Sequence, residues 1–223
     1  MKRLLAASVA TGAILAAGVA QAAPTLRLTS GVDTVTVQDG DPFDATPLAG
    51  AVTFIGSIGS FALNVTTGQT KPFIGTPVFP VLDLNDVSTS SVAGGSITIE
   101  FSETGFNSTA ATLNFITAIG GTTQGMLSYE VFINDSDTLF ARETQIADFD
   151  FDTLAFSGTQ TQSLLGPLGD YSITLVATIT HTANGVTSFD GFTSVPEPAT
   201  LALVGLGLLG AGFARRRRPA CAV

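Results

Sequence analysis

Apolar and polar residues alternate along most of the central part of this chain. In residues 96–102, 127–133 and 172–180, apolar side chains occupy every second position. A period of two with many β-branched residues is typical of half-buried β-strands. Gly- and Asn-rich turn signals separate the runs, and Asn184-Gly185 predicts a hairpin that follows a strand ending near His181. The pattern predicts about nine or ten short strands in an all-β fold, an antiparallel β-sandwich or jelly-roll-like domain.

The first 22 residues have the three parts of a secretory signal peptide. Lys2 and Arg3 form a positive start, residues 4–20 are mostly small or apolar, and Ala22 ends a small-x-small cleavage site. We expect this segment to form a helix, to direct export through the Sec machinery and to be cut by signal peptidase after Ala22. An uncleaved N-terminal anchor is the alternative, and Pro24 with the polar residues after it disfavours a longer helix.

A second apolar segment, residues 199–214, lies near the C-terminus and is predicted to be a helix. Its 16 residues would span about 24 Å, which is short for a hydrocarbon core about 30 Å thick. A cluster of four Arg residues follows the segment, and by the positive-inside rule these charges keep the C-terminal end of the segment in the cytoplasm. This orientation agrees with export of the domain that precedes the segment. A buried core helix is the alternative, but the charges beside it are out of place in a core. Those charges are Arg215, Arg216, Arg217 and Arg218.

Pro196, Glu197 and Pro198 stand just before this apolar segment, and the two prolines favour an extended, accessible backbone. The order of Pro-Glu-Pro, short hydrophobic helix and Arg cluster over residues 195–218 resembles the PEP-CTERM sorting signal of Gram-negative bacteria. The resemblance implies transient anchoring in the inner membrane and cleavage near the prolines by a membrane protease called exosortase. It also implies delivery to the cell surface or to an exopolysaccharide biofilm matrix. Residues 219–223 form a short tail after the signal.

The passenger domain, residues 23–194, is strongly acidic. It holds three basic and 17 acidic residues, so its net charge is −14, whereas the whole chain has a net charge of −9. This balance disfavours nucleic acid as a partner and favours cations. The chain has one Cys, Cys221 in the tail, which excludes a disulfide framework and a Cys-based zinc site. We therefore expect no cofactor, with Ca²⁺ as the alternative.

Clustered carboxylates are the residues on which a Ca²⁺ site would depend, because hard cations prefer oxygen ligands. The candidate ligands are Asp39, Asp41, Asp44, Asp135 and Asp137, which lie in two predicted loops. Asp residues also stabilise turns without any ion, so solvated turns are the alternative interpretation. A third acidic run, Asp148 to Asp152, alternates with Phe149 and Phe151, which predicts a polar outer face over a Phe-lined core.

The sequence offers little to a catalytic interpretation. His181 lies on the apolar side of its strand, which favours a hydrogen-bonded structural histidine, and no Gly-x-Ser-x-Gly motif supplies a nucleophile. The chain has no Trp and two Tyr, which weakens glycosidase and lectin interpretations.

We therefore expect an exported, non-enzymatic protein with a structural or adhesive role at the cell surface or in the matrix. The alternative is a Ca²⁺-dependent carbohydrate-binding module whose partner is exopolysaccharide, and a secreted hydrolase is a third hypothesis.

Overall fold

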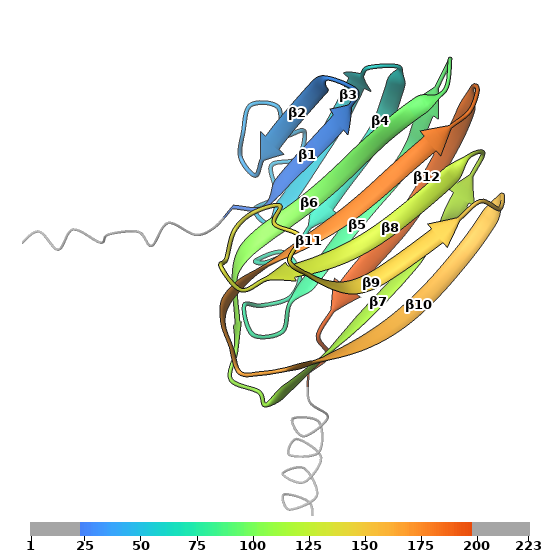
Figure 1. Cartoon of the computed structure of the whole chain (residues 1–223). Helices are drawn as coiled ribbons and strands as arrows, with labels where there is room; N and C mark the ends of the chain where they lie inside the picture. Colours follow the sequence, from blue (N-terminus) through green and yellow to red (C-terminus); the bar gives the residue numbers. More distant parts are fainter. Residues whose placement is uncertain (1–22, 198–223) are drawn as a thin grey trace, which may run out of the picture.

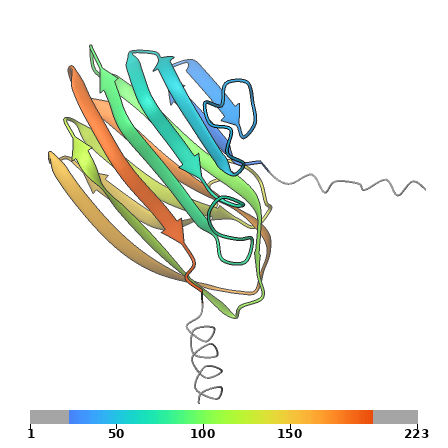
Figure 2. The same cartoon turned by 180° about the vertical axis from the view of Figure 1, so that it is seen from behind.

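A computed structural model describes residues 23–197, which form twelve β-strands and, within that range, no helix. The strands make two six-stranded antiparallel sheets that pack face to face as a sandwich, seen from its two sides in Figures 1 and 2. The strands are β1 Thr25–Ser30, β2 Asp33–Gln38, β3 Ala51–Ile58, β4 Phe61–Gln69, β5 Val81–Ser91, β6 Gly95–Ser108, β7 Thr112–Thr123, β8 Met126–Asn134, β9 Thr144–Phe151, β10 Ala155–Leu165, β11 Leu168–His181 and β12 Gly185–Ser194.

The order of the strands defines the topology. Sheet A, in front in Figure 1, has the order β2-β1-β6-β11-β8-β9, and sheet B has the order β10-β7-β12-β5-β4-β3. Strands β5 to β12 have the arrangement of an eight-stranded jelly roll, in which each strand crosses to the other sheet except for the hairpin β8–β9 within sheet A. The hairpins β1–β2 and β3–β4 widen one sheet each. The predicted all-β antiparallel fold is confirmed. The two flanking helices predicted at residues 1–22 and 199–214 lie outside the described residues.

The structure has more strands than the nine or ten that the sequence predicted, and some of them are long rather than short. Twelve strands are present in the described part, and β6 and β11 are each 14 residues long. Strand β10 was difficult to predict because Phe156 is the one buried residue in its burial pattern. The hydrophobic alternation that reveals a half-buried strand is therefore missing there.

The predicted hairpin at Asn184-Gly185 was wrong. The turn joins β11 of sheet A to β12 of sheet B, so the chain crosses the sandwich and the two strands do not pair. Gly185 is buried against the ring of His181, where an added Cβ would lie 3.0 Å from the nearest ring atom. A tight turn suits a hairpin and a crossing between sheets equally well, so the turn residues could not separate the two.

The inward faces of both sheets form one apolar core. Long aliphatic and aromatic side chains from both sheets fill it, and Tyr129 and Tyr171 are the largest fully buried side chains. On β9, Phe149 is buried while Asp148 and Asp150 are exposed, which confirms the predicted polar outer face. The outward faces carry mainly Ser, Thr, Asn and Asp, and these faces hold the candidate site.

Candidate functional site

A shallow groove of about 430 Å³ crosses the outer face of sheet B over β10, β7 and β12. Its floor is low because Gly120 lies between Ser157 on β10 and Asp190 on β12 in the ladder. One step along, Ala118 lies between Thr159 and Phe192, so small side chains again separate larger ones. The result is a trough with hydroxyl groups on one side and a carboxylate and an exposed aromatic ring on the other.

Strand β5 adds polar groups beside the groove. Asn85 lies opposite Asp190, and Asp83 lies opposite Phe192. A second hollow continues the groove past Gly121 to Asn85. Burial and, to a smaller degree, the charge of Asp190 raise the pKa of the Asp83 carboxyl to about 6. The negative charges of Asp83 and Asp190 therefore repel each other on this face.

This surface can accept a polar ligand that also has a flat apolar side. Amide, carboxylate and hydroxyl groups offer hydrogen-bond donors and acceptors, and the Phe192 ring is 38 % exposed and available for stacking. A sugar ring has this combination of hydroxyl edges and C–H faces. The acids disfavour an anionic ligand, because the three basic residues of the described part are paired elsewhere.

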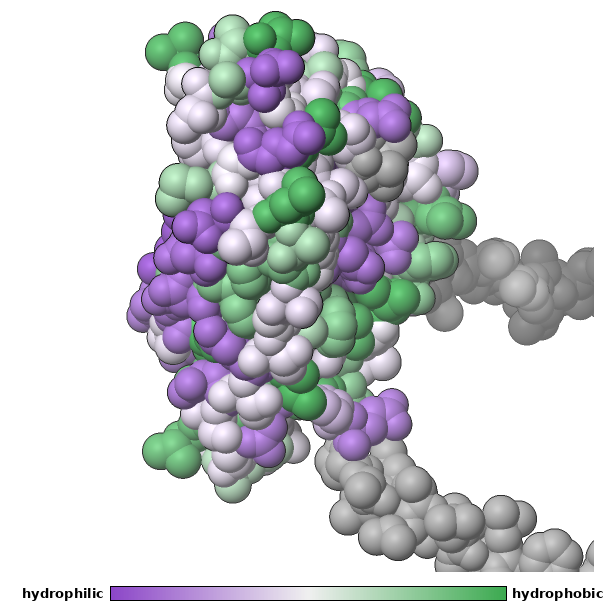
Figure 3. Space-filling model, turned by 90° about the vertical axis from the view of Figure 1, so that its right-hand side faces the viewer, coloured by the Kyte–Doolittle hydropathy of each residue, from purple (hydrophilic) through white to green (hydrophobic). Residues whose placement is uncertain are grey.

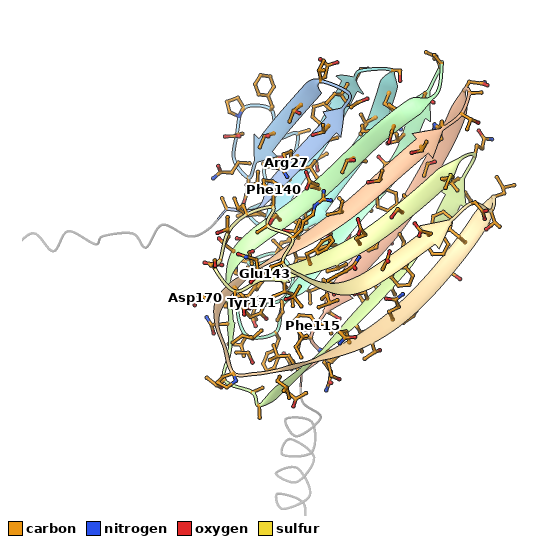
Figure 4. All side chains as sticks on the ribbon, in the orientation of Figure 1. Arg27, Phe115, Phe140, Glu143, Asp170 and Tyr171 are labelled. Atoms are coloured by element: carbon orange, nitrogen blue, oxygen red, sulfur yellow. The ribbon has the colours of Figure 1, made fainter. Side chains whose placement is uncertain are left out.

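Two of these basic residues lie on the outer face of sheet A. Glu100 pairs with Arg27 at 2.6 Å and with Arg142 at 2.8 Å, and the guanidinium of Arg27 lies 4.0 Å from the centre of the Phe140 ring. Figure 4 shows Arg27 and Phe140 next to each other on this side. Burial opposes ionisation of Glu100, but the hydrogen bonds from both Arg residues outweigh it and lower its pKa. The cluster fastens the loop between β8 and β9 onto the sheet.

The third basic residue is buried in a pair. Lys71 Nζ lies 3.3 Å from Glu103 Oε1, donates a hydrogen bond to the Thr104 carbonyl and sits 4.2 Å from the centre of the Phe106 ring. Burial raises the pKa of Glu103 to about 7 and lowers that of Lys71, although each partner favours the charge of the other. The second carboxylate oxygen of Glu103 is buried with no hydrogen-bond partner.

The carboxylates predicted to bind Ca²⁺ take part in turns. In the loop between β2 and β3, Asp39 accepts from the Gly50 N–H at 2.7 Å and Asp41 from the Gln38 N–H at 3.0 Å. Asp44 accepts from three backbone N–H groups of the same region, one of them that of Thr53.

The second group of candidate ligands lies in the loop between β8 and β9. Asp137 accepts from the Gly105 N–H at 2.8 Å, and the Asp135 N–H donates to Glu143 at 3.4 Å. Within residues 23–197, no three His, Cys, Asp or Glu side chains are grouped as a metal site would need. Binding of Ca²⁺ stays a prediction.

His181 is a structural residue in a buried polar chain. Its Nδ1 lies 2.8 Å from Ser91 Oγ, its Nε2 lies 2.9 Å from Thr187 Oγ1, and Thr187 continues to Thr123 at 2.7 Å. Burial lowers the pKa of His181. These contacts confirm the prediction of a hydrogen-bonded histidine at a strand end.

The residues predicted for processing lie at the end of the fold. The Val195 N–H donates to the Pro80 carbonyl at 3.0 Å, and Pro196 and Glu197 border a hollow of about 490 Å³ that Phe79 and Leu113 also line. Ala22, Pro198 and the four Arg residues Arg215, Arg216, Arg217 and Arg218 lie outside the described residues. Among residues 23–197, no helix is long and apolar enough to cross a membrane.

The sequence prediction missed the groove on sheet B. Asp83 and Asn85 alternate with buried Leu82 and Leu84, and Asp190 and Phe192 flank buried Gly191, so each strand presents its polar residues outward. The alternation was visible in the sequence. The sequence did not show that β12 pairs with both β5 and β7, because β5 and β7 are far from β12 along the chain.

Comparison with known proteins identifies the C-terminal motif. A family model for the PEP-CTERM protein-sorting motif matches residues 194–218. The chain therefore carries a PEP-CTERM sorting signal, which implies an exported protein that is processed by an exosortase and sorted to the cell surface. No curated protein matches the chain.

Several solved structures resemble parts of the sandwich distantly. Tailspike protein 4 of bacteriophage CBA120 has 14% identity and a TM-score of 0.30, and the match covers 59% of this chain and 19% of the tailspike. The ribosomal oxygenase YcfD of Escherichia coli has 13% identity and a TM-score of 0.27, over 92% of this chain and 49% of YcfD. The isomalto-dextranase of Arthrobacter globiformis has 10% identity and a TM-score of 0.22, over 65% and 21%. These scores are too low to support an argument about function.

Proposed function

We propose that this protein is a non-catalytic structural or adhesive component of the cell surface or of the exopolysaccharide matrix. Its sorting signal implies export and exosortase processing, which would deliver the jelly roll to that location. The fold suits such a role, because the closely paired strands of both sheets present broad polar faces.

The groove on sheet B is the observation that carries this proposal. Hydroxyl groups of Ser157 and Thr159, the carboxylate of Asp190 and the exposed ring of Phe192 surround a floor of Gly120. We infer that this surface binds a neutral or amino-sugar polysaccharide by hydrogen bonding and by stacking on Phe192. An anionic polymer would be repelled by Asp190 and by the net negative charge of the domain.

The test uses the processed protein purified from its host and the exopolysaccharide of the same host. Co-sedimentation or calorimetry should detect binding, and Phe192→Ser should weaken it about 5- to 150-fold, because an aromatic stacking contact is worth about 1–3 kcal/mol. Phe43→Ser is the matched control, since Phe43 is exposed in the loop between β2 and β3. Equal binding by wild type, Phe192→Ser and Phe43→Ser would remove the groove from the proposal.

The same assay separates the Ca²⁺-dependent alternative. The groove as proposed needs no ion, so binding should persist in a chelator. Loss of binding in the chelator and recovery with Ca²⁺ would favour the Ca²⁺-dependent module and its loop carboxylates, of which Asp41→Asn and Asp137→Asn are the variants to examine.

A further inference from the structure

Each sheet of the sandwich has two edge strands, and three of the four edges are blunted. On β3, the Thr53 N–H donates to Asp44 at 2.9 Å and the Thr53 carbonyl accepts from the Ala45 N–H at 2.9 Å. On β9, the side-chain amide of Gln160 bonds to both the N–H and the carbonyl of Asp148. Strand β2 is six residues long and begins with a charged residue. Such features prevent pairing with another strand.

The fourth edge, β10, is the least protected, since only two exposed side chains bond to its outer backbone: Thr153 donates to the Ala155 carbonyl at 3.2 Å and Gln162 donates to the Ser163 carbonyl at 3.3 Å. The strand runs for 11 residues, Ala155–Leu165, without a charged residue or a proline. It pairs with β7 in an unbroken register, and in the described residues no other strand pairs with its second side. Figure 3 views the molecule from the right-hand side of Figure 1, the side on which β9 and β10 lie, and on this side pale, hydrophobic and hydrophilic residues are interspersed. An open, uncharged edge of this length is a template for a further strand.

The hydrogen bonds that bracket β10 show which of its backbone groups take no part in the ladder with β7. The Leu154 carbonyl accepts from the Thr123 N–H, and the Gly166 N–H donates to the Ala111 carbonyl. Both pairs keep the register of the β10–β7 ladder, in which even-numbered residues of β10 therefore bond to β7. The N–H and carbonyl groups of the odd-numbered residues, from Ala155 to Leu165, point toward the open edge.

The odd-numbered residues are also chemically self-complementary. If two copies of β10 pair antiparallel around Gln160, Ala155 faces Leu165, Ser157 faces Ser163, and Thr159 faces Thr161. Apolar ends meet apolar ends and hydroxyls meet hydroxyls, and every pair of this kind joins residues whose backbone groups bond to no other strand. The Thr153 and Gln162 side chains, which donate to the Ala155 and Ser163 carbonyls, are exposed on β10 or next to it and would give way to the new ladder. The register thus satisfies the backbone and the outward side chains together.

We propose that β10 pairs with β10 of a second copy of this chain, which gives a two-fold dimer with a continuous sheet made of both copies of sheet B. A two-fold axis closes the contact, so the expected product is a dimer rather than a filament. The two grooves, which include Ser157 and Thr159, then lie on one surface on either side of the axis. The pairing rests on the backbone of β10 and does not depend on the glycan role.

The test measures the mass of the processed protein in solution by light scattering and analytical ultracentrifugation. Wild type should form a dimer that strengthens with added salt, because two strongly acidic domains repel each other and salt screens this repulsion. The variant Thr159→Asp/Thr161→Asp places like charges opposite each other and should be monomeric. Thr36→Asp on the edge strand β2 is the control and should leave the dimer intact.

A charge-swap experiment makes the test specific. The variant Thr159→Lys/Thr161→Lys should also be monomeric alone, while an equimolar mixture with the Asp variant should give a heterodimer. Circular dichroism and melting temperature confirm that both variants fold, since both positions point outward on an exposed strand. A wild type that stays monomeric at high salt would overturn the proposal. A dimer that survives the Asp substitutions would also overturn it, because another surface would then make the contact.

Discussion

Asp83 is half-buried on β5 beside Asp190, and burial and that second carboxylate raise its pKa from 3.8 to about 6. Because the folded pKa lies above the unfolded one, the protein loses stability as the pH rises through about 6, and the loss is absent below about 4. Asp83→Asn should therefore raise the free energy of unfolding by about 1–2 kcal/mol near pH 8, a value reduced for partial solvation.

Urea denaturation of wild type and Asp83→Asn at several pH values measures this difference. The stability gain of the variant should shrink steadily between about pH 7 and pH 4. Asp33→Asn is the control, because Asp33 is exposed on β2. A gain that is independent of pH would show that ionisation of Asp83 is not its cause.

Lys71 is a buried cation whose ion pair with Glu103 is expected to stabilise the fold. Lys71→Met removes the partner of Glu103 and the hydrogen bond to the Thr104 carbonyl, and it leaves a buried carboxyl without a cation. We expect a loss of about 3 kcal/mol, as for other buried pairs that lose one member. The double variant Lys71→Met/Glu103→Leu should regain most of that stability, because no buried charge remains. If chemical denaturation finds the double variant less stable than Lys71→Met, the pair is not the source of the effect.

At the scale of the elements, alternation predicted the strands and could not predict their partners. Residues 97–101 and 173–179 read correctly as half-buried strands because one face of each is apolar. The alternation pattern did not predict strand β10, since polar residues occupy both of its faces. The candidate groove combines β5, β7, β10 and β12, so its residues became neighbours only once the strand order was known.

The crossing between β11 and β12 gives a prediction at this scale. Gly185 begins β12 directly against the His181 ring, so Gly185→Ala would place a methyl group about 3.0 Å from ring atoms and force the ring away from Thr187. We expect a loss of about 1–3 kcal/mol in chemical denaturation, the usual result of overpacking. Gly169→Ala in β11 is the control, because no atom lies within 4 Å of its added Cβ. A similar effect of both substitutions would contradict the packing of His181 in the crossing.

At the scale of the whole molecule, the position of the sorting signal relative to the fold decides what processing leaves behind. Strand β12 ends at Ser194, and the PEP-CTERM match begins at the same residue. The Val195 N–H still bonds to the Pro80 carbonyl, so a cut near Pro196 would keep the whole sandwich and remove the rest of the signal. The processed protein should thus be as stable as the sandwich within the uncut chain.

Intact mass and fractionation of the protein from its native host test this arrangement. Wild-type cells should release a species that begins near Ala23 and ends near Pro196, and an exosortase deletion should retain a membrane-bound form with the C-terminal segment. The melting temperature of the detergent-solubilised uncut form should match that of the released form, because processing leaves β12 and its ladders to β5 and β7 untouched. If the C-terminal segment remains in both strains, it is a permanent anchor and delivery to the matrix fails. If the cut instead falls within β12, the released protein should melt at a clearly lower temperature, since a central strand of sheet B would lose its end.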